Sequence, residues 1–222
     1  MKRALLTVQG INNKQGYLYE EVSKATWLTE QYEFITDAQT DKYFSDKMKT
    51  SIAKGLNAIT LNQWSRLGDV WYFFKNALAR EQVAKAVGRR ITILQDQGYE
   101  VDVIAHSLGN LITICSSDAE RDLKVNNFYS LANPLFIKIR ALRKGWFGLP
   151  GVLPYVAVNR NKFSAKKITA LWSNSDLVAG KYDSASHNLL RNISDEEPEL
   201  REISGTGHST AKYLDYLETL MD

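Results

Sequence analysis

The stretch Val101-Asp102-Val103-Ile104-Ala105-His106-Ser107-Leu108-Gly109-Asn110 decides how the chain is interpreted. A short run of β-branched and apolar residues leads into Ala-His-Ser-Leu-Gly, and an apolar pattern typical of a helix follows. This is the strand–turn–helix context in which a serine hydroxyl is held outward on a sharp turn. Small residues at Ala105 and Gly109 suit such a turn, because it brings the backbone on either side of the serine close together. The stretch therefore predicts Ser107 as a nucleophile.

The rest of the chain repeats the alternation of strand and helix patterns. Apolar runs predict strands at 3–8, 32–36, 100–105, 128–132 and 168–172, and periodic stripes predict helices at 17–30, 44–56, 83–94, 108–119 and 209–220. Strands that alternate with helices indicate an α/β fold with a mostly parallel sheet and helices on both faces. We expect residues 1–222 to form a single domain.

Composition narrows the class of protein further. The 222 residues include 24 aromatic side chains and 44% hydrophobic residues, which is enough for one large core. The net charge of +3 is too small to indicate a nucleic-acid partner. Cys115 is the only cysteine, so it forms no internal disulfide, and we expect it in the core. Neither a signal peptide nor a membrane span is visible, and we expect a cytoplasmic protein.

A serine nucleophile needs a histidine as its base, and the chain has three. His106 lies in the sharp turn, where we expect its side chain to point away from the hydroxyl and to support the turn. His187 lies in a polar stretch that reads as a surface loop, and it remains an alternative base. His208 directly precedes the final helix pattern, in Gly205-Thr206-Gly207-His208, and we favour it as the base.

The orienting acid is expected just after a strand that follows Ser107 along the chain. Asp176 meets this condition after the strand at 168–172, and the apolar residues 177–179 that follow would anchor its loop. An ordinary turn or helix-capping role is the alternative for Asp176. Asp183 and Asp195 are weaker candidates, because neither follows a strand pattern.

An oxyanion hole is the third requirement of this chemistry, and it is built from backbone N–H groups. The amide of Leu108, directly after the nucleophile, is one expected donor. The second is expected in the loop after the first strand, at Ile11, with Gly10 allowing close approach of the backbone. A plain strand-ending turn is the alternative interpretation of Gln9-Gly10-Ile11.

Taken together, these motifs resemble those of α/β-hydrolases of the lipase and carboxylesterase type. Val8-Gln9-Gly10-Ile11 resembles the strand-end oxyanion motif, although Gln9 stands where the family often has histidine. Ala105–Gly109 is similar to the nucleophile elbow of small lipases, and Asp176-Leu177-Val178 resembles the Asp-x-Val acid loop. The resemblance implies ester hydrolysis through an acyl-enzyme without metal or organic cofactor, with Gln9 and Gly10 supporting the oxyanion loop.

An acid-free segment lies between two of the predicted strands. Residues 123–175 contain no Asp or Glu but nine basic residues, which are Lys124, Lys138, Arg140, Arg143, Lys144, Arg160, Lys162, Lys166 and Lys167. Most of this segment, 134–167, falls where α/β-hydrolases usually carry a cap or lid. It is interpreted either as a substrate-facing lid with a basic rim or as a helical excursion whose basic face pairs with acids elsewhere, such as Asp195 and Glu199.

The sequence therefore predicts a serine esterase acting on a small-molecule or lipid ester, with weak contact to an anionic membrane surface through 134–167 as a further option. An acyltransferase or thioesterase using the same three residues is one alternative. A non-catalytic binding protein on a hydrolase fold is another, and it would be favoured by a separation of more than about 5 Å between His208 and Ser107. The oligomeric state is left open.

Overall fold

A parallel β-sheet organises the molecule in the computed structural model, which describes residues 2–10, 16–40, 77–134, 162–176 and 184–221. Six strands pair in the order β2-β1-β3-β4-β5-β6, and every pair is parallel. The strands are β1 (Lys2–Val8), β2 (Phe34–Asp37), β3 (Tyr99–His106), β4 (Leu123–Leu131), β5 (Phe163–Ser173) and β6 (Glu199–Ile203). The predicted α/β class with a mostly parallel sheet is confirmed.

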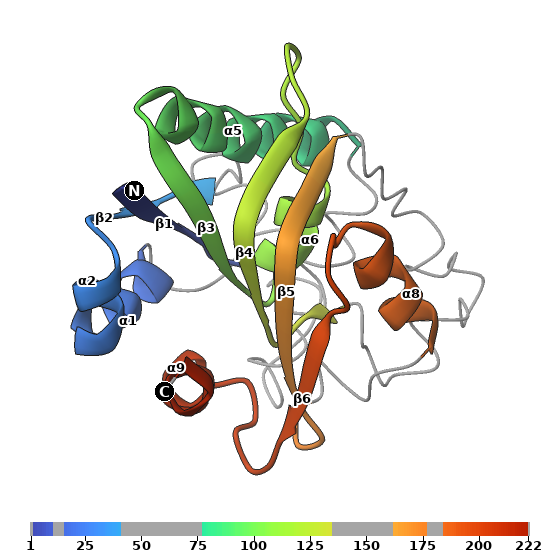
Figure 1. The fold of residues 1–222 in the computed structure, drawn as a ribbon. Coiled ribbons are helices and arrows are strands. Elements are labelled where there is room, and N and C mark those ends of the chain that lie inside the picture. The colour runs from blue at the N-terminus through green and yellow to red at the C-terminus, as the bar shows by residue number, and fades with distance from the viewer. Residues whose placement is uncertain (1, 11–15, 41–76, 135–161, 177–183, 222) are drawn as a thin grey trace, which may run out of the picture.

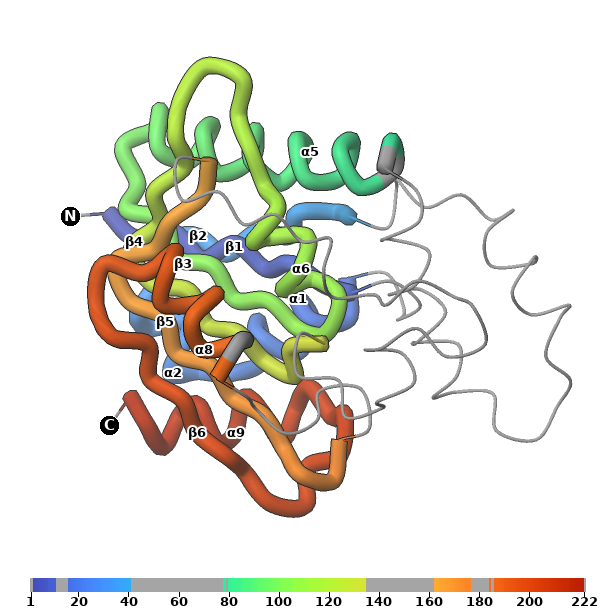
Figure 2. Tube along the Cα trace, turned by 90° about the vertical axis from the view of Figure 1, so that its right-hand side faces the viewer, coloured from blue at the N-terminus to red at the C-terminus, as the bar shows by residue number. Residues whose placement is uncertain are grey.

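Helices cover both faces of the sheet (Figure 1). One face packs against α5 (Ala77–Asp96), α6 (Leu108–Ile114) and α8 (Ser184–Asn192). The other packs against α1 (Tyr17–Lys24), α2 (Thr26–Gln31) and α9 (Thr210–Met221). Figure 2 shows α5 and α9 on opposite sides of the sheet. The fold therefore has three layers with a separate apolar core on each side of the sheet.

The two cores follow from the alternation of side chains along each strand. On β1, Leu5 enters the core with α1 and α9, whereas its neighbour Leu6 enters the core with α5 and α6. On β3, Ile104 likewise enters the core with α1 and α9, and its neighbour Val103 enters the core with α5 and α6. Both faces are buried, so these strands are nearly continuous apolar runs, as expected for the centre of a parallel sheet.

The connections reverse direction between β1 and β3. The chain passes from β1 to the edge strand β2, and then returns across β1 to β3 and onward to β6. The chain therefore continues from β1 and from β3 to helices on opposite faces of the sheet, α1 and α6. Ligands of open parallel sheets bind at such a reversal. Gly10 follows β1 and Ser107 follows β3, so both lie at the carboxyl edge of the sheet, where the connections reverse.

Several predicted elements differ from the observed ones. The helix predicted at 17–30 is two helices, because Ala25 adopts an extended conformation between α1 and α2. The helix predicted at 108–119 ends at Ile114, since the chain then crosses α5 so closely that a Cβ on Gly88 would lie 2.2 Å from the Ser117 carbonyl oxygen. Strand β6 and helix α8 were not predicted at all. The predicted helix at 44–56 lies outside the described residues.

The end of the predicted insertion also needs correction. We placed 134–167 between two strands, but Phe163–Lys167 form the first part of β5, where Leu123 pairs with Phe163 and Asn127 with Lys167. Lys166 and Lys167 are exposed there. The basic residues at this end of β5 concealed the strand, because they interrupt the apolar pattern that identifies its second half.

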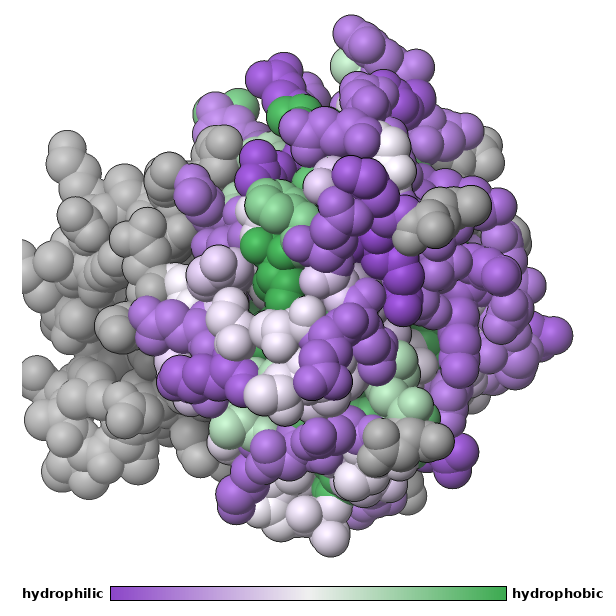
Figure 3. Space-filling view, turned by 60° about the vertical axis from the view of Figure 1, so that its left-hand side comes forward, coloured by the Kyte–Doolittle hydropathy of each residue, from purple (hydrophilic) through white to green (hydrophobic). Residues whose placement is uncertain are grey.

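The visible surface carries few large apolar side chains. The face in Figure 3 is mainly hydrophilic, with hydrophobic residues showing only in limited areas. Among the described residues, the exposed large apolar side chains are Tyr19, Phe34, Leu78, Ile93 and Met221. Within the same residues, every helix is too short or too polar to cross a lipid bilayer.

Candidate active site

Ser107 occupies a strained turn between β3 and α6. Its backbone has φ 57° and ψ −131°, in a region that residues with a side chain rarely adopt. Such strain persists only where the surroundings fix it. The Ser107 N–H donates a hydrogen bond to the Leu131 carbonyl at the end of β4, with an N···O distance of 3.0 Å. The predicted sharp turn at Ser107 is therefore present and tied to the neighbouring strand.

Two further residues hold this turn in place. A Cβ atom on Gly109 would lie 2.0 Å from the carbonyl oxygen of Val8, so only glycine lets the start of α6 pass β1. The buried amide of Asn110 donates to the carbonyl oxygens of Ser107 at 2.9 Å and Leu131 at 2.8 Å. Sequence reasoning identified Gly109 but missed Asn110, which carried no signal beyond its place after the turn.

The structure brings Ser107, His208 and Asp176 together from three different loops. The Nε2 atom of His208 lies 2.9 Å from Ser107 Oγ, and Nδ1 of the same ring lies 2.7 Å from Asp176 Oδ2. Asp176 follows β5 and His208 lies in the loop between β6 and α9. The Asp176 side chain is fully buried and that of His208 is 9% exposed, so water does not separate these groups.

The loops that carry Asp176 and His208 are also joined to each other. The Gly207 N–H donates to Ser175 Oγ at 3.0 Å, and Ser175 Oγ in turn lies 2.9 Å from Ser173 Oγ. The Tyr213 hydroxyl lies 3.3 Å from Asp176 Oδ2 and donates towards it. Sequence reasoning missed Ser175 and Tyr213, because Tyr213 reads simply as part of the apolar stripe of the last helix.

His106 lies closer to these residues than we expected. Its buried ring is tilted against the ring of His208, with 4.8 Å between ring centroids, and its centroid lies 6.2 Å from that of Tyr213. The prediction gave the His106 side chain a role in supporting the turn, pointing away from the Ser107 hydroxyl. In the structure, His106 packs directly against the imidazole of His208, which the prediction had not foreseen.

The expected oxyanion region lies beside Ser107. A Cβ on Gly10 would lie 3.0 Å from the Leu108 nitrogen and 3.1 Å from Ser107 Cβ, so the loop after β1 touches the turn. Leu108 begins α6, and the first N–H groups of a helix have no partner within the helix. Ile11, the second expected donor, lies outside the described residues.

The side chain of Gln9 fixes the loop that leads to Gly10. Its Oε1 atom accepts a hydrogen bond from the Leu18 N–H at the start of α1, with an N···O distance of 2.7 Å. The Gln9 carbonyl accepts a second bond from Thr40 Oγ1 at 2.9 Å. Gln9 therefore anchors the loop after β1 to α1 and to the chain after β2.

His187 and Asp195, the alternative base and one alternative acid, contact other partners. His187 is on α8 rather than in a loop, and its Nε2 lies 3.0 Å from Glu197 Oε1. Asp195 pairs with Lys124, and its N–H donates to the Ala165 carbonyl. Asp183 lies outside the described residues. Among the described candidates, His208 and Asp176 are the ones that the structure brings to Ser107.

Most of the basic segment 134–167 lies outside the described residues. Its described flanks nevertheless show pairing with acids, because Lys124 lies 2.9 Å from Asp195 and Lys167 lies 3.4 Å from Glu199. Burial acts to raise the pKa of Glu199, but hydrogen bonds from Arg201 and Lys167 outweigh it and lower that pKa below its ordinary value. Lys124 and Lys167 lie on β4 and β5, so these pairs do not choose between the lid and the solvated basic face for the rest of the segment.

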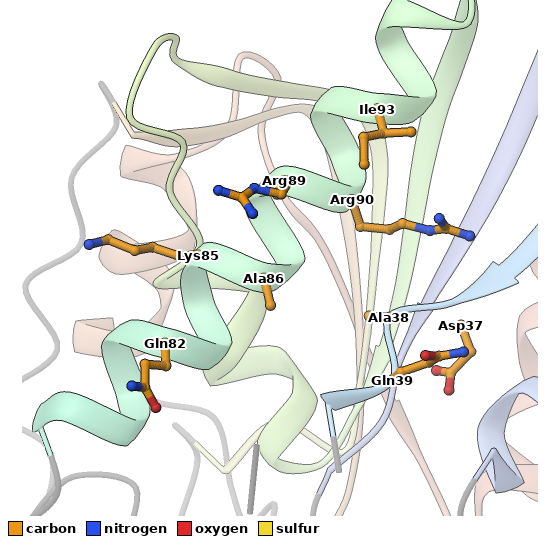
Figure 4. Close-up of a pocket in the computed structure, with 9 residues that line it drawn as sticks. All are labelled: Asp37, Ala38, Gln39, Gln82, Lys85, Ala86, Arg89, Arg90 and Ile93. Atoms are coloured by element: carbon orange, nitrogen blue, oxygen red, sulfur yellow. The ribbon is translucent and has the colours of Figure 1, made fainter. Parts of the chain in front are cut away.

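A separate cavity of about 650 Å³ lies between the end of β2 and α5 (Figure 4). Its described lining includes Asp37 and Gln39 on one side, and Lys85, Arg89 and Arg90 on α5. Arg90 reaches towards Asp37 and donates to Thr36 Oγ1, whereas Lys85 and Arg89 extend to the other side of the helix. The three cations do not converge on one point, and none of the described lining residues is Ser107, Asp176 or His208.

The described residues show no cluster of metal ligands. Across these residues, no group of three or more histidine, cysteine, aspartate or glutamate side chains is placed to hold a metal ion. The arrangement of Ser107, His208 and Asp176 instead suits proton transfer between side chains.

Comparison with solved structures assigns the fold. The chain is similar to the esterase Pf2001 of Pyrococcus furiosus, with TM-score 0.56, 13% identity, and coverage of 99% of this chain and 80% of that one. It is similar to TT1662 of Thermus thermophilus, with TM-score 0.57, 14% identity and coverage of 97% and 88%. It is also similar to acetyl xylan esterase 1 of a Thermoanaerobacterium species, with TM-score 0.54, 13% identity and coverage of 99% and 74%.

No model of a known protein family and no curated protein matches the sequence. The structural likeness establishes that the chain has the α/β-hydrolase fold, as the motifs predicted. At this level of identity it does not extend to the reaction, which has to be argued from the site itself.

Proposed function

We propose that the protein is a serine hydrolase that cleaves carboxylic esters through an acyl-enzyme intermediate. The observation that carries the proposal is the continuous chain of contacts from Ser107 Oγ through the His208 ring to Asp176 Oδ2. A serine hydroxyl within 2.9 Å of an imidazole, which is itself held by a buried carboxylate, has the geometry of an activated nucleophile.

In the first half of the reaction, Ser107 Oγ attacks the carbonyl carbon of the ester and His208 Nε2 takes the hydroxyl proton. The bond from Oγ to the carbonyl carbon forms, and the carbonyl oxygen becomes an oxyanion. When the intermediate collapses, the bond to the alcohol oxygen breaks and His208 Nε2 returns the proton to the leaving alcohol. The acyl group then remains on Ser107.

The oxyanion would be held by the Leu108 N–H, because this amide directly follows the nucleophile. The amide of Ile11 is the proposed second donor, in the loop that Gly10 brings against the Ser107 turn. A donor of this kind typically contributes a factor of about 10² to 10³ to turnover. The anchoring of Gln9 by Leu18 supports this loop.

In the second half, water attacks the acyl carbon while His208 Nε2 accepts one of its protons. The bond between the carbonyl carbon and Ser107 Oγ then breaks, Oγ recovers the proton and the carboxylic acid leaves. Asp176 keeps His208 in the tautomer that presents Nε2 to the serine, and it stabilises the charged imidazole without taking the proton itself.

The 2.9 Å contact between His208 and Ser107 argues against a non-catalytic protein, for which we expected a separation above about 5 Å. An acyltransferase or thioesterase would use the same three residues, so products formed with competing alcohols and thiols are the test between acceptors. A small-molecule ester and a lipid ester differ in the length of the acyl chain, which is the quantity to vary first.

The proposal is tested by hydrolysis of p-nitrophenyl esters of increasing acyl length. The wild-type protein is expected to release p-nitrophenol with at least one of these esters, and Ser107→Ala is expected to remain at background. Ser184→Ala, which removes an exposed hydroxyl on α8, is the matched control and is expected to keep full activity. Hydrolysis that survives unchanged in Ser107→Ala would contradict the proposal. A sharp preference for short chains would disfavour a lipid substrate.

A further inference from the structure

One buried tyrosine contacts the acid of the candidate site. The Tyr213 side chain on α9 is fully buried, and its hydroxyl lies 3.3 Å from Asp176 Oδ2. This is the same carboxylate oxygen that lies 2.7 Å from His208 Nδ1. Tyr213 and His208 therefore approach one oxygen atom of Asp176 from two elements that are adjacent in the sequence.

The phenol also reaches the loop that carries the base. The Tyr213 hydroxyl lies 3.5 Å from the Gly207 carbonyl oxygen, one residue before His208. Its aromatic ring lies near the ring of His106, which also packs against the ring of His208. Tyr213 thus stands where the Asp176 loop, the His208 loop and the His106 ring meet.

The protonation state of Tyr213 suits a donor. Burial, together with the charge of Asp176, raises the pKa of the Tyr213 phenol well above its ordinary value. The hydroxyl therefore keeps its proton over the range in which a histidine works as a base, and a carboxylate is its strongest acceptor nearby. The 3.3 Å separation is longer than an ideal O–H···O bond, so its effect is expected to be moderate.

We propose that Tyr213 is a positioning residue for the pair formed by His208 and Asp176. Its hydroxyl donates to Asp176 Oδ2, limits the rotation of the carboxylate and draws off part of the charge that the carboxylate presents to His208. The proposal rests on the function proposed above, in which His208 is the base, but Tyr213 itself touches neither Ser107 nor the substrate.

Removal of this hydroxyl has two separable consequences. Asp176 loses a donor, so its charge acts more strongly on His208 and favours the protonated ring. The acid limb of the pH–rate profile is then expected to move to higher pH. Among the described residues, the titratable side chains that contact the His208 ring are Asp176 and His106, and both remain in the variant. A looser carboxylate also slows acylation, by about threefold to tenfold for one hydrogen bond.

The experiment compares Tyr213→Phe with Tyr129→Phe in the full chain. Tyr129 is also buried, but its hydroxyl contacts Tyr32, Arg3 and the Met221 sulfur, the last at 3.8 Å, and not Asp176. NMR titration of the His208 ring, together with the rate of fluorophosphonate labelling, is measured for both variants and the wild type. With three histidines in the chain, the ring signals are assigned by substitution of His106 and His187.

A His208 titration midpoint that moves to higher pH in Tyr213→Phe only, with labelling about threefold to tenfold slower and unchanged in Tyr129→Phe, supports the proposal. An unchanged midpoint, or equal effects in both variants, overturns it and leaves Tyr213 as a packing residue. The NMR titration does not depend on activity. If the wild type fails to label while the midpoint still moves, the proposed function fails and the positioning role stands.

Discussion

The Nε2 atom of His208 lies 2.9 Å from the hydroxyl oxygen of Ser107, although 101 sequence positions separate the two residues. The parallel sheet explains the meeting. Ser107 follows β3, Asp176 follows β5 and His208 follows β6, and the carboxyl ends of parallel strands open on the same edge. Loops from strands far apart in the chain therefore place their side chains around one point.

Replacing the acid tests how His208 is oriented. Asp176→Asn removes the charge next to Nδ1 and can offer that nitrogen a donor, which favours the wrong tautomer of the ring. We expect ester turnover to fall by a factor of about 10³ to 10⁴. Asp195→Asn is the matched control, because Asp195 pairs with Lys124 instead. Steady-state kinetics on both variants give the comparison, and equal activities would exclude Asp176 as the orienting acid.

The contact of Gly10 with the Ser107 turn predicts an effect on the oxyanion site. In Gly10→Ala the new methyl group would lie 3.0 Å from the Leu108 nitrogen, so it crowds the proposed donor. We expect acylation to slow by a factor of about 10 to 100, with the protein still folded. Gly109→Ala is the contrast, because a Cβ 2.0 Å from the Val8 carbonyl prevents the fold itself. Fluorophosphonate labelling of Gly10→Ala at the wild-type rate would contradict this view of the site.

A buried carboxylate in the middle of β3 predicts a stability effect without a catalytic one. Asp102 is fully buried and accepts hydrogen bonds from Arg3 at 2.7 Å, Tyr32 at 2.6 Å and the Asn127 N–H at 2.8 Å. Asp102→Ala leaves these donors without their acceptor, although the partly exposed Arg3 can turn to water. We expect the free energy of unfolding to fall by about 2 to 4 kcal/mol.

Chemical denaturation measures this loss, and Glu33→Gln provides its control. Glu33 pairs with Lys2 at the surface, where water screens the pair, so its loss is expected to change stability little. Both variants are expected to keep the wild-type labelling rate at Ser107 under conditions where they are folded. If the free energy of unfolding falls no further in Asp102→Ala than in Glu33→Gln, the hydrogen bonds to Asp102 do not stabilise the fold.

The single cysteine gives a pH-dependent prediction. Burial raises the pKa of the Cys115 thiol to about 11, so at pH 8 only about one thiol in a thousand is ionised. Only the thiolate reacts with disulfide reagents. We therefore expect Ellman's reagent to react far more slowly with the folded protein than with the urea-unfolded protein, and the rate to rise with pH up to about 11. Rapid reaction of the folded protein with the reagent at pH 8 would show that the Cys115 thiol is neither buried nor raised in pKa.

Much of this architecture is predictable from the sequence because it depends on local patterns. The strands β1 and β3 are nearly continuous apolar runs, and Ser107 sits where one of them meets a helix pattern between small residues. His208 and Asp176 could be chosen because the chain offers few histidines and few acids after a strand. The order Ser107, then Asp176, then His208 along the chain further limited which acid and which histidine could serve the serine.

The missed elements lack such local signals. Strand β6, with the sequence Glu-Leu-Arg-Glu-Ile, lies at the edge of the sheet and carries charges that mask its pattern. The chain breaks at Ala25, between α1 and α2, although no glycine or proline stands there. The break lets both helices bury their apolar residues in the same core. The contacts of Asn110 and Tyr213 depend on which loops meet in space, which a pattern along one segment cannot show.

Covalent capture tests the central claim most directly. A fluorophosphonate reacts only with an activated serine, forming a bond from Oγ to phosphorus as fluoride leaves. The folded wild-type protein is expected to gain a single adduct, mapped by peptide mass spectrometry to Ser107, while Ser107→Ala and heat-unfolded protein gain none. Folded wild-type protein that does not label, or an adduct that persists in Ser107→Ala, would contradict the assignment of Ser107 as the nucleophile.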